Sequence, residues 1–204
     1  MGWAAPIYES YCPLIGLGAR FRRMTLRHAG LRMGEQVLDV GCGTGVLSRG
    51  ASDAVGPDGA VQGIDAAPAM VAVARREAAK AGSRAQFKVA AIEALPFETE
   101  YFDVVLSSLM LHHLPPEAKR QGLREVRRVL KDGGRLIVVD VDRPALPWWL
   151  LMWPLLFMPP VAPNLRGEIP AYLEGAGFAR IAAQGRWGGL LTVWVAHKEG
   201  WQRI

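Results

Sequence analysis

The chain has 204 residues, of which 50% are hydrophobic and 21% are charged; this excludes a disordered chain and suffices for one domain with a sizeable core. Its 24 lysines and arginines against 19 acidic residues give a formal net charge of +5, an excess too small to indicate nucleic acid as a partner. The only two cysteines, Cys12 and Cys42, exclude a disulfide framework and a cysteine-based metal site, and we expect a cytoplasmic protein without a bound metal.

The first ten residues lack the basic and then apolar pattern of a secretion signal. No apolar stretch reaches about 18 residues without proline breaks, so we expect no ordinary membrane span. Residues 16–29 have the periodicity of a helix, with Arg20, Arg23 and Arg27 on one face. That face is either solvated or turned towards an anion or a membrane.

Strand-like and helix-like segments then alternate as far as residue 141. The predicted strands are 36–40, 60–64, 85–89, 102–107 and 135–141, and the predicted helices are 46–54, 68–81 and 117–130. Pro68 begins the second of these helices and Gly82 closes it, whereas the turn at 132–134 is expected to end the third. This alternation is typical of a parallel sheet covered by helices on both faces.

The last third of the chain has a different pattern. Residues 178–183 and 190–197 are strand-like and a glycine-rich turn separates them, so we expect them to pair antiparallel. Residues 147–163 contain no charge and carry Trp148, Trp149 and Trp153 between prolines, which makes this segment too short and too broken to span a bilayer. It is interpreted as a lid over a lipid-like substrate or at a membrane interface, as a plainly buried lid, or as a contact between subunits.

A glycine-rich loop, residues 39–45 (DVGCGTG), follows the first predicted strand. Glycines there let a ligand approach the backbone, and the next helix presents free N–H groups. Asp65 lies twenty residues after Gly45, at the end of the second strand, where an acid can accept both hydroxyls of a ribose. The pattern indicates an adenosine-containing cofactor. A dinucleotide fingerprint would place its third glycine at Val46, so a nucleotide-dependent oxidoreductase is the weaker alternative.

Four blocks of sequence resemble the class I S-adenosylmethionine-dependent methyltransferases. Within this family, their motif sequences most resemble those of the ubiquinone/menaquinone-biosynthesis group. The blocks are VLDVGCGTG, GIDAAPAMVAVAR, ALPFETEYFDVVLSSLMLHHL and LREVRRVLKDGGRLIVVD, which lie in order over residues 35–141. The resemblance implies a Rossmann-like, doubly wound α/β fold whose seven-stranded sheet is parallel except for its last strand. We divide the single expected methyltransferase domain into a helical cap (1–34), a cofactor-binding core (35–141), an apolar lid insertion (142–170) and a C-terminal helix and strand pair (171–204).

The resemblance also implies which residues hold the cofactor. The residues around the methionine end of S-adenosylmethionine would be Asp39, Gly41, Gly43 and Gly45. Asp65 would bind the ribose hydroxyls, and Ala66 and Met70 would lie against the adenosine. Residues 91–97 match the adenine-binding block, but Ala91 stands where family members carry Asp or Asn. One hydrogen bond to the adenine amino group is therefore expected to be missing, which leaves the backbone of Ile92 as the contact.

Methyl transfer from a sulfonium needs mainly proximity and alignment, so a sparse catalytic set is expected. His112 and His113 follow the fourth strand as candidate bases, with a structural role as the alternative. Asp140 ends the fifth strand at the same edge and is a candidate substrate contact. Cys42 is interpreted as a packing residue rather than a nucleophile. The remaining candidates for the substrate site are Tyr8, Tyr11, Trp148, Trp149 and Trp153.

The sequence therefore predicts S-adenosylmethionine-dependent methyl transfer to a small, hydrophobic or lipid-like acceptor. A non-catalytic protein that binds S-adenosylmethionine is an alternative, favoured by Ala91. Peripheral membrane contact and a homodimer are compatible with the apolar segment, and no nucleic-acid partner is expected.

Overall fold

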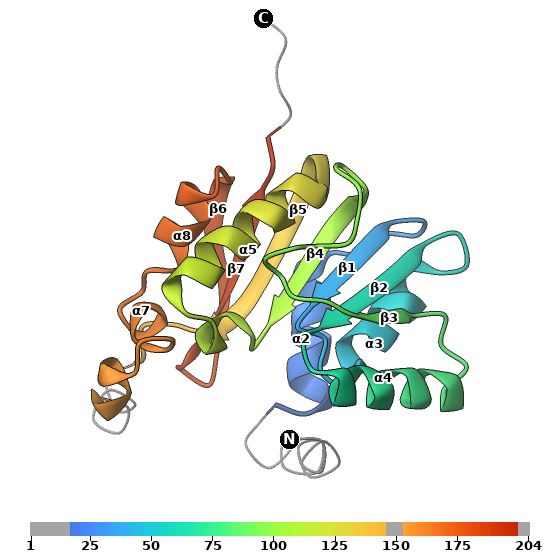
Figure 1. Ribbon diagram of the computed structural model, residues 1–204, viewed down its shortest axis with the longest axis horizontal. Coiled ribbons are helices and arrows are strands. Elements are labelled where there is room, and N and C mark those ends of the chain that lie inside the picture. The colour runs from blue at the N-terminus through green and yellow to red at the C-terminus, as the bar shows by residue number, and fades with distance from the viewer. Residues whose placement is uncertain (1–16, 146–152, 200–204) are drawn as a thin grey trace, which may run out of the picture.

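The strands of the computed structural model join into one seven-stranded sheet in the order β3-β2-β1-β4-β5-β7-β6 (Figure 1). The structure describes residues 17–145 and 153–199. The strands are β1 (Gln36–Val40), β2 (Ala60–Asp65), β3 (Gln86–Val89), β4 (Phe102–Ser108), β5 (Leu130–Val141), β6 (Ala179–Trp187) and β7 (Leu191–His197). The helices are α2 (Ala19–Ala29), α3 (Val46–Val55), α4 (Pro68–Lys80), α5 (Pro116–Val129), α7 (Ala162–Leu165) and α8 (Ile169–Gly175), with short 3-10 turns η2 (Leu111–His113) and η3 (Trp153–Phe157).

The pairing of the strands confirms the predicted sheet. Strand β1 pairs in parallel with β2 and β4, and the parallel arrangement continues to β3 on one side and β5 on the other. Strand β7 lies between β5 and β6 and is antiparallel to both. Buried parallel strands need apolar side chains on both faces, and residues 37–40 of β1 are all buried. The carboxyl ends of β1, β2, β4 and β5 consequently meet at one edge of the sheet.

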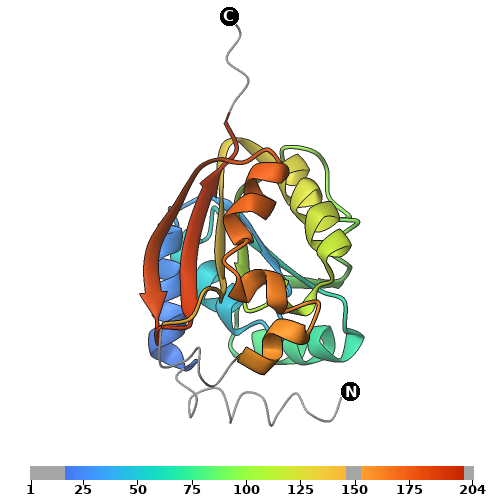
Figure 2. The same cartoon turned by 90° about the vertical axis from the view of Figure 1, so that its left-hand side faces the viewer.

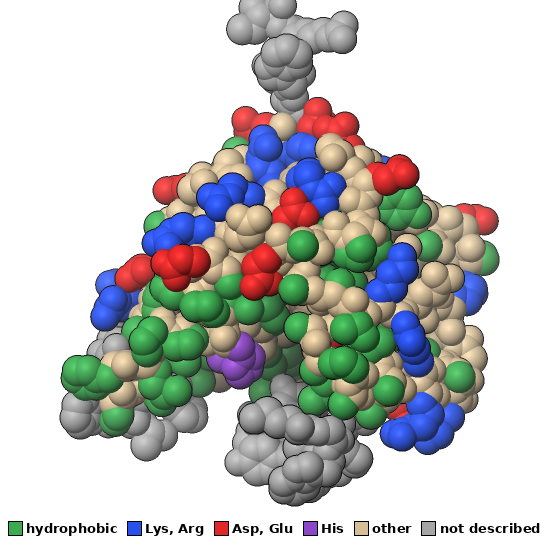
Figure 3. Space-filling view, viewed as in Figure 1, with side chains coloured by type: hydrophobic (Ala, Val, Ile, Leu, Met, Phe, Trp, Pro, Cys, Tyr) green, Lys and Arg blue, Asp and Glu red, His purple; other side chains and the backbone are tan. Residues whose placement is uncertain are grey.

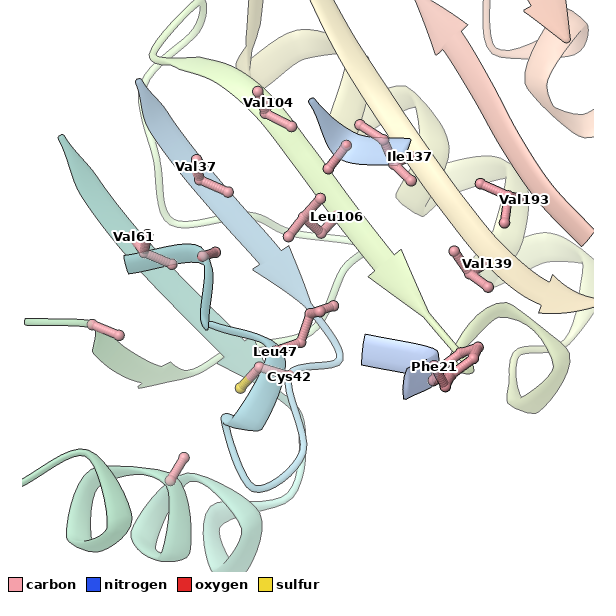
Figure 4. Close-up of a cluster of buried hydrophobic side chains, with 14 of the residues drawn as sticks. Phe21, Val37, Cys42, Leu47, Val61, Val104, Leu106, Ile137, Val139 and Val193 are labelled. Carbon is pink, nitrogen blue, oxygen red and sulfur yellow. The ribbon is translucent and has the colours of Figure 1, made fainter. Parts of the chain in front are cut away.

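Helices cover both faces of the sheet (Figures 1 and 2). Helices α2, α3 and α4 pack on the face that presents Val37, Val104 and Ile137 (Figure 4). Helices α5 and α8 pack on the opposite face, which presents Leu38 and Val105. Because successive strand side chains point to opposite faces, one apolar run in each central strand, such as β1 or β4, supplies both cores.

Four predicted boundaries need correction. Helix α2 begins at Ala19 rather than residue 16, and β6 continues to Trp187 because its residues keep pairing with β7. Helix α5 ends at Val129, and the turn at 132–134 does not end it, because Leu130 is already extended and pairs with Phe102 of β4. Strand β5 therefore begins at Leu130 rather than at residue 135, and Gly133 donates to the carbonyl of Lys198 at 2.8 Å.

The predicted apolar segment, 147–163, is described only from Trp153 onwards, as η3 and the start of α7. Ala162 and Leu165 are buried, whereas the side chains of Phe157 and Met158 are 79% and 49% exposed. In residues 17–145 and 153–199, no helix combines the length and the apolar character that crossing a bilayer requires. Tyr8, Tyr11, Trp148 and Trp149 lie outside the described residues.

Candidate active site

A cavity of about 510 Å³ opens at the carboxyl ends of β1, β2 and β4 and is bordered by α2. Five of the predicted cofactor residues line it, and four of these are Asp39, Gly41, Gly43 and Asp65. Met70, at the start of α4, also lines it. The strand order explains the meeting of these side chains, because β1 lies between β2 and β4 and all three end at the same edge.

The glycine loop is held in a backbone conformation that side chains rarely adopt. Gly43 has a φ of +53°, and a Cβ added there would have no atom within 4 Å, so its missing side chain leaves open space beside the loop. Gly41 has a φ of +70°, and a Cβ there would overlap the side chain of Met110. A side chain at Gly45 would approach Cζ of Phe87 to 2.6 Å. Gly43 therefore fits close approach of a ligand, whereas Gly41 and Gly45 also permit local packing.

Asp65 joins the end of β2 to the glycine loop. Its Oδ2 accepts from the backbone N–H of Gly43 at 3.0 Å, and its Oδ1 accepts from the N–H of Ala67 at 2.8 Å. Each carboxylate oxygen has a second lone pair, so both remain able to accept from a pair of hydroxyl groups. These two hydrogen bonds fix the carboxylate at the cavity wall before any ligand binds.

Asp39 is a buried acid at the wall of the same cavity. Its side chain is 2% exposed, and the hydroxyl of Ser48 donates to its Oδ2 at 2.5 Å. Burial, opposed by this hydrogen bond and reinforced by the charge of Asp65, raises the pKa of Asp39 from 3.8 to about 7. Within residues 17–145 and 153–199 Asp39 forms no ion pair, and a buried carboxyl in this state fits a ligand that brings a positive charge, as the methionine end of S-adenosylmethionine does.

Cys42 packs within the loop. It is 9% exposed, and burial raises the pKa of its thiol, so the thiolate that a nucleophile needs is not available. The geometry agrees with its interpretation as a packing residue.

Three other predicted cofactor residues lie away from the lining. Gly45 and the exposed Ala66 adjoin lining residues, Val46 and Ala67 respectively. Ile92 is 6% exposed, and its side chain packs against Gly122 of α5. Ala91 is exposed. Most of the residues predicted to hold the methionine end and the ribose therefore line the cavity, whereas Ile92, predicted to contact the adenine, does not.

Behind the cavity, Asp140 organises the turn that follows β4. Its fully buried carboxylate accepts from the N–H groups of Met110 and Leu111 at 3.1 and 2.7 Å. Its Oδ1 lies 2.6 Å from Nδ1 of His112. With the proton on Nδ1, His112 keeps Nε2 as an acceptor. Asp140 and His112 are absent from the described lining of the cavity and support it from behind.

His113 reaches the cavity itself. Its ring centroid lies 3.9 Å from that of His112. Burial, and then the neighbouring charge of His112, lower the pKa of His113 from its ordinary 6.5, against the opposing effect of Asp140. His113 is therefore neutral at physiological pH, which is the form that accepts a proton.

Several lining residues were not predicted from the sequence. Leu17 enters the cavity from just before α2, and Phe21 and Arg22 enter from its first turn. Leu109 and Met110 enter from the loop after β4. Leu109 and Met110 come just after a strand end, and this position could have identified them as cavity residues. Arg22 belongs to no motif that would have identified it. Phe21 is held by an edge contact with Trp187, with ring centroids 5.9 Å apart.

Comparisons with known proteins agree with this geometry. Residues 37–134 match the family described as a methyltransferase domain. A demethylmenaquinone methyltransferase of Staphylococcus aureus is 30% identical over 201 residues, which covers 88% of this chain and 82% of that protein. Among solved structures, an S-adenosylmethionine-dependent methyltransferase from Aquifex aeolicus is 25% identical with a TM-score of 0.72, covering 87% of this chain and 89% of that one. Phosphoethanolamine N-methyltransferase 2 of Haemonchus contortus, in complex with S-adenosyl-L-methionine, is 17% identical with a TM-score of 0.71, covers 90% of this chain and 53% of that one, and shares the fold.

The sheet order and the glycine-loop cavity define an enzyme that transfers a methyl group from S-adenosylmethionine. The chain belongs to the class I S-adenosylmethionine-dependent methyltransferase family. The predicted class, activity and cofactor are confirmed, and the oxidoreductase and non-catalytic alternatives were wrong.

Proposed function

We propose that the acceptor is a quinone-like molecule in its reduced, hydroxyl-bearing form with an apolar body. The observation that carries this proposal is the composition of the wall facing the glycine loop, where Leu17, Phe21, Leu109 and Met110 surround the neutral His113. A flat apolar ring is complementary to such a wall, and a hydroxyl group needs a base such as His113. The name of the Staphylococcus aureus relative, a demethylmenaquinone methyltransferase, supports the same acceptor class.

The proposed roles follow from the position of each residue. S-adenosylmethionine supplies a methyl group activated by its sulfonium sulfur. Asp39 holds the cationic methionine end, and Asp65 holds the ribose hydroxyls. His113 receives the proton that the acceptor loses as its nucleophilic atom bonds to the methyl carbon and the carbon–sulfur bond breaks. Of the two candidate bases, His113 is then the base, while His112 and the predicted substrate contact Asp140 position it.

The acceptor is tested by measuring transfer of tritium-labelled methyl groups by the full chain. We expect label in reduced demethylmenaquinone presented in detergent micelles, and none in phosphoethanolamine, a polar acceptor. Micelles without quinone are the control. Label in phosphoethanolamine alone, or cofactor binding without transfer to the quinone, would refute the proposed acceptor.

We further propose that residues 142–170 form a lid that meets a membrane surface. Hydrophobic side chains gather along the lower edge of the molecule on both sides of a hollow (Figure 3). Phe157 and Met158, both well exposed, belong to this described part of the chain. The start of α2, with the exposed Arg20 and Arg23, lies at the same edge in both ribbon views (Figures 1 and 2). Apolar side chains beside cations favour an anionic lipid surface.

The lid is anchored to the body of the protein by one buried cation. Lys119 of α5 is 1% exposed, and its Nζ donates to the carbonyl of Pro160 and to Oδ1 of Asn164, both at 2.7 Å. The anchored residues follow directly after Phe157 and Met158, so these side chains are presented outward. Cytoplasmic location and the predicted role of the tryptophans remain predictions.

Sedimentation with liposomes separates the membrane contact from the alternatives. We expect the full chain to bind vesicles of phosphatidylglycerol and phosphatidylcholine, with binding falling as salt is added. Phe157→Ser with Met158→Ser should weaken binding, whereas Arg76→Ser, an exposed change on α4, should not. If the double variant instead changes the oligomeric state in solution, the segment is a subunit contact.

A further inference from the structure

The cavity is divided by charge. Asp39 and Asp65 lie on the glycine-loop side, where the ammonium, the sulfonium and the ribose of the cofactor bind. On the other side lie Leu17, just before α2, and Phe21 and Arg22 of α2. Arg22 is the sole Lys or Arg among the lining residues that the structure describes, and His113 is neutral. The apolar wall therefore carries one permanent positive charge.

The guanidinium of Arg22 has unused hydrogen-bond donors. Within residues 17–145 and 153–199 no hydrogen bond or ion pair of its side chain is formed, whereas Arg75, Arg128 and Arg135 donate to carbonyls or carboxylates. Arg20 and Arg23 also lack partners in this part of the chain, but they are exposed to water. Arg22 is half-buried and faces the cavity. A guanidinium in such a position matches a carboxylate or another oxyanion.

The helix that carries Arg22 is fixed at its far end. Arg135 of β5 donates to the carbonyls of Ala29 and Gly30, each at 2.8 Å, and also pairs with Glu35 at 2.8 Å. Phe21, the neighbour of Arg22, is 3% exposed and rests on Trp187. Arg22 is therefore placed at the cavity by a rigid element rather than by a loop, as a binding group should be.

We propose that Arg22 is the anion-recognition residue of this cavity. Two sources supply the anion: the carboxylate at the methionine end of the cofactor, and an ionised hydroxyl of the acceptor. The first source needs a cation because the methionine end is zwitterionic and the other charged groups on the described wall, Asp39 and Asp65, are acids. The second source rests on the proposed quinol acceptor, and the first does not.

Calorimetric binding to the full chain distinguishes the sources. The variants are Arg22→Gln, with Arg22→Lys to restore the charge, and Arg23→Gln as the matched control on the exposed face of the same turn. The probes are S-adenosylhomocysteine, its decarboxylated analogue and, with S-adenosylhomocysteine present, the anion 2-naphthoate and its neutral counterpart 2-acetylnaphthalene.

If Arg22 binds the cofactor carboxylate, Arg22→Gln lowers the affinity for S-adenosylhomocysteine by about 10-fold or more and leaves the affinity for the decarboxylated analogue unchanged. If Arg22 binds the acceptor oxyanion, Arg22→Gln lowers the affinity for 2-naphthoate to a similar extent and leaves the affinity for 2-acetylnaphthalene unchanged. Arg22→Lys should recover part of the loss in either case. The proposal is overturned if Arg22→Gln binds all four probes as Arg23→Gln does. Loss of methyl transfer to quinol with these binding differences intact would refute the acceptor but not the role of Arg22.

Discussion

The carboxylate of Asp140 lies 2.6 Å from the imidazole of His112 and is fully buried, although Asp140 lies near the carboxyl end of β5 and His112 follows β4, at the edge of the sheet where the cavity opens. The same carboxylate accepts from two backbone N–H groups of the turn that carries His113. Asp140 thus determines the shape of the cavity wall without forming part of its described lining. The proposed division between a base and its positioning residues depends on this arrangement.

Replacing Asp140 with Asn should test that arrangement. Asn presents one acceptor and one donor where the turn requires acceptors, so we expect a loss of stability of about 1–3 kcal/mol. The kcat should fall, while the affinity for S-adenosylhomocysteine stays within about twofold, because the glycine loop is not touched. Chemical denaturation measures the stability, calorimetry the affinity, and transfer of labelled methyl groups the kcat. A variant with wild-type kcat would exclude a positioning role for Asp140.

The rate of methyl transfer should depend on the protonation of His113. Its pKa is lowered from 6.5, so the neutral, proton-accepting form persists at neutral pH and is lost only under more acidic conditions. We expect kcat/KM to fall on the acid side with an apparent pKa below 6.5. His113→Gln should remove this acid limb and lower kcat by about 100-fold or more. An unchanged pH profile in His113→Gln would assign the proton transfer to another group.

The binding of S-adenosylmethionine should release a proton near pH 7. The pKa of Asp39 is about 7 in the ligand-free protein, and a cation bound beside it will lower this pKa. Calorimetry in buffers of different ionisation enthalpy should therefore show about half a proton released at pH 7 and almost none at pH 9.

The same pKa gives a prediction for stability. Because the pKa of Asp39 is raised above its unfolded value of 3.8, its contribution is fully present below pH 3.8 and is lost as pH rises through about 7. Asp39→Asn, which cannot ionise, should make the ligand-free protein more stable at pH 8 by about 4 kcal/mol relative to its effect at pH 4. The same substitution should also lower the affinity for S-adenosylmethionine. A pH-independent effect of this substitution would mean that Asp39 has an ordinary pKa.

Restoring the acidic residue of the adenine-binding block should strengthen cofactor binding. Ala91 is exposed, so Ala91→Asp introduces no buried charge. One added hydrogen bond to the adenine amino group contributes about 0.5–1.5 kcal/mol, or about 2- to 13-fold in affinity for S-adenosylhomocysteine. Ala94→Asp, at a nearby exposed position, is the control. Equal affinities in the two variants would show that the adenine lies elsewhere.

The sheet and the glycine-loop half of the cavity were predictable from the sequence because their signals are local. Strand ends, glycines and Asp65 occur at fixed spacing, and the order of parallel strands brings their carboxyl ends together. Arg22 was not predictable, since the spacing of Arg20, Arg23 and Arg27 identifies the exposed face of α2 and does not reveal what the residues between them approach. Burial of Asp140 beneath the turn depends on a contact across 28 residues, between His112 and Asp140, which no local pattern encodes. The ends of α5 and β5 were misplaced because pairing of Leu130 with Phe102 outweighed the turn signal at 132–134.

The ammonium of Lys119 restricts how the lid is able to move. It binds Pro160 and Asn164 at once, at a site with almost no access to water, so separating either residue from α5 leaves a buried charge with an unfilled donor. Residues 160–164 are therefore held against α5, and if the proposed lid opens to admit an acceptor, we expect these residues to keep their contacts with Lys119 while it does so.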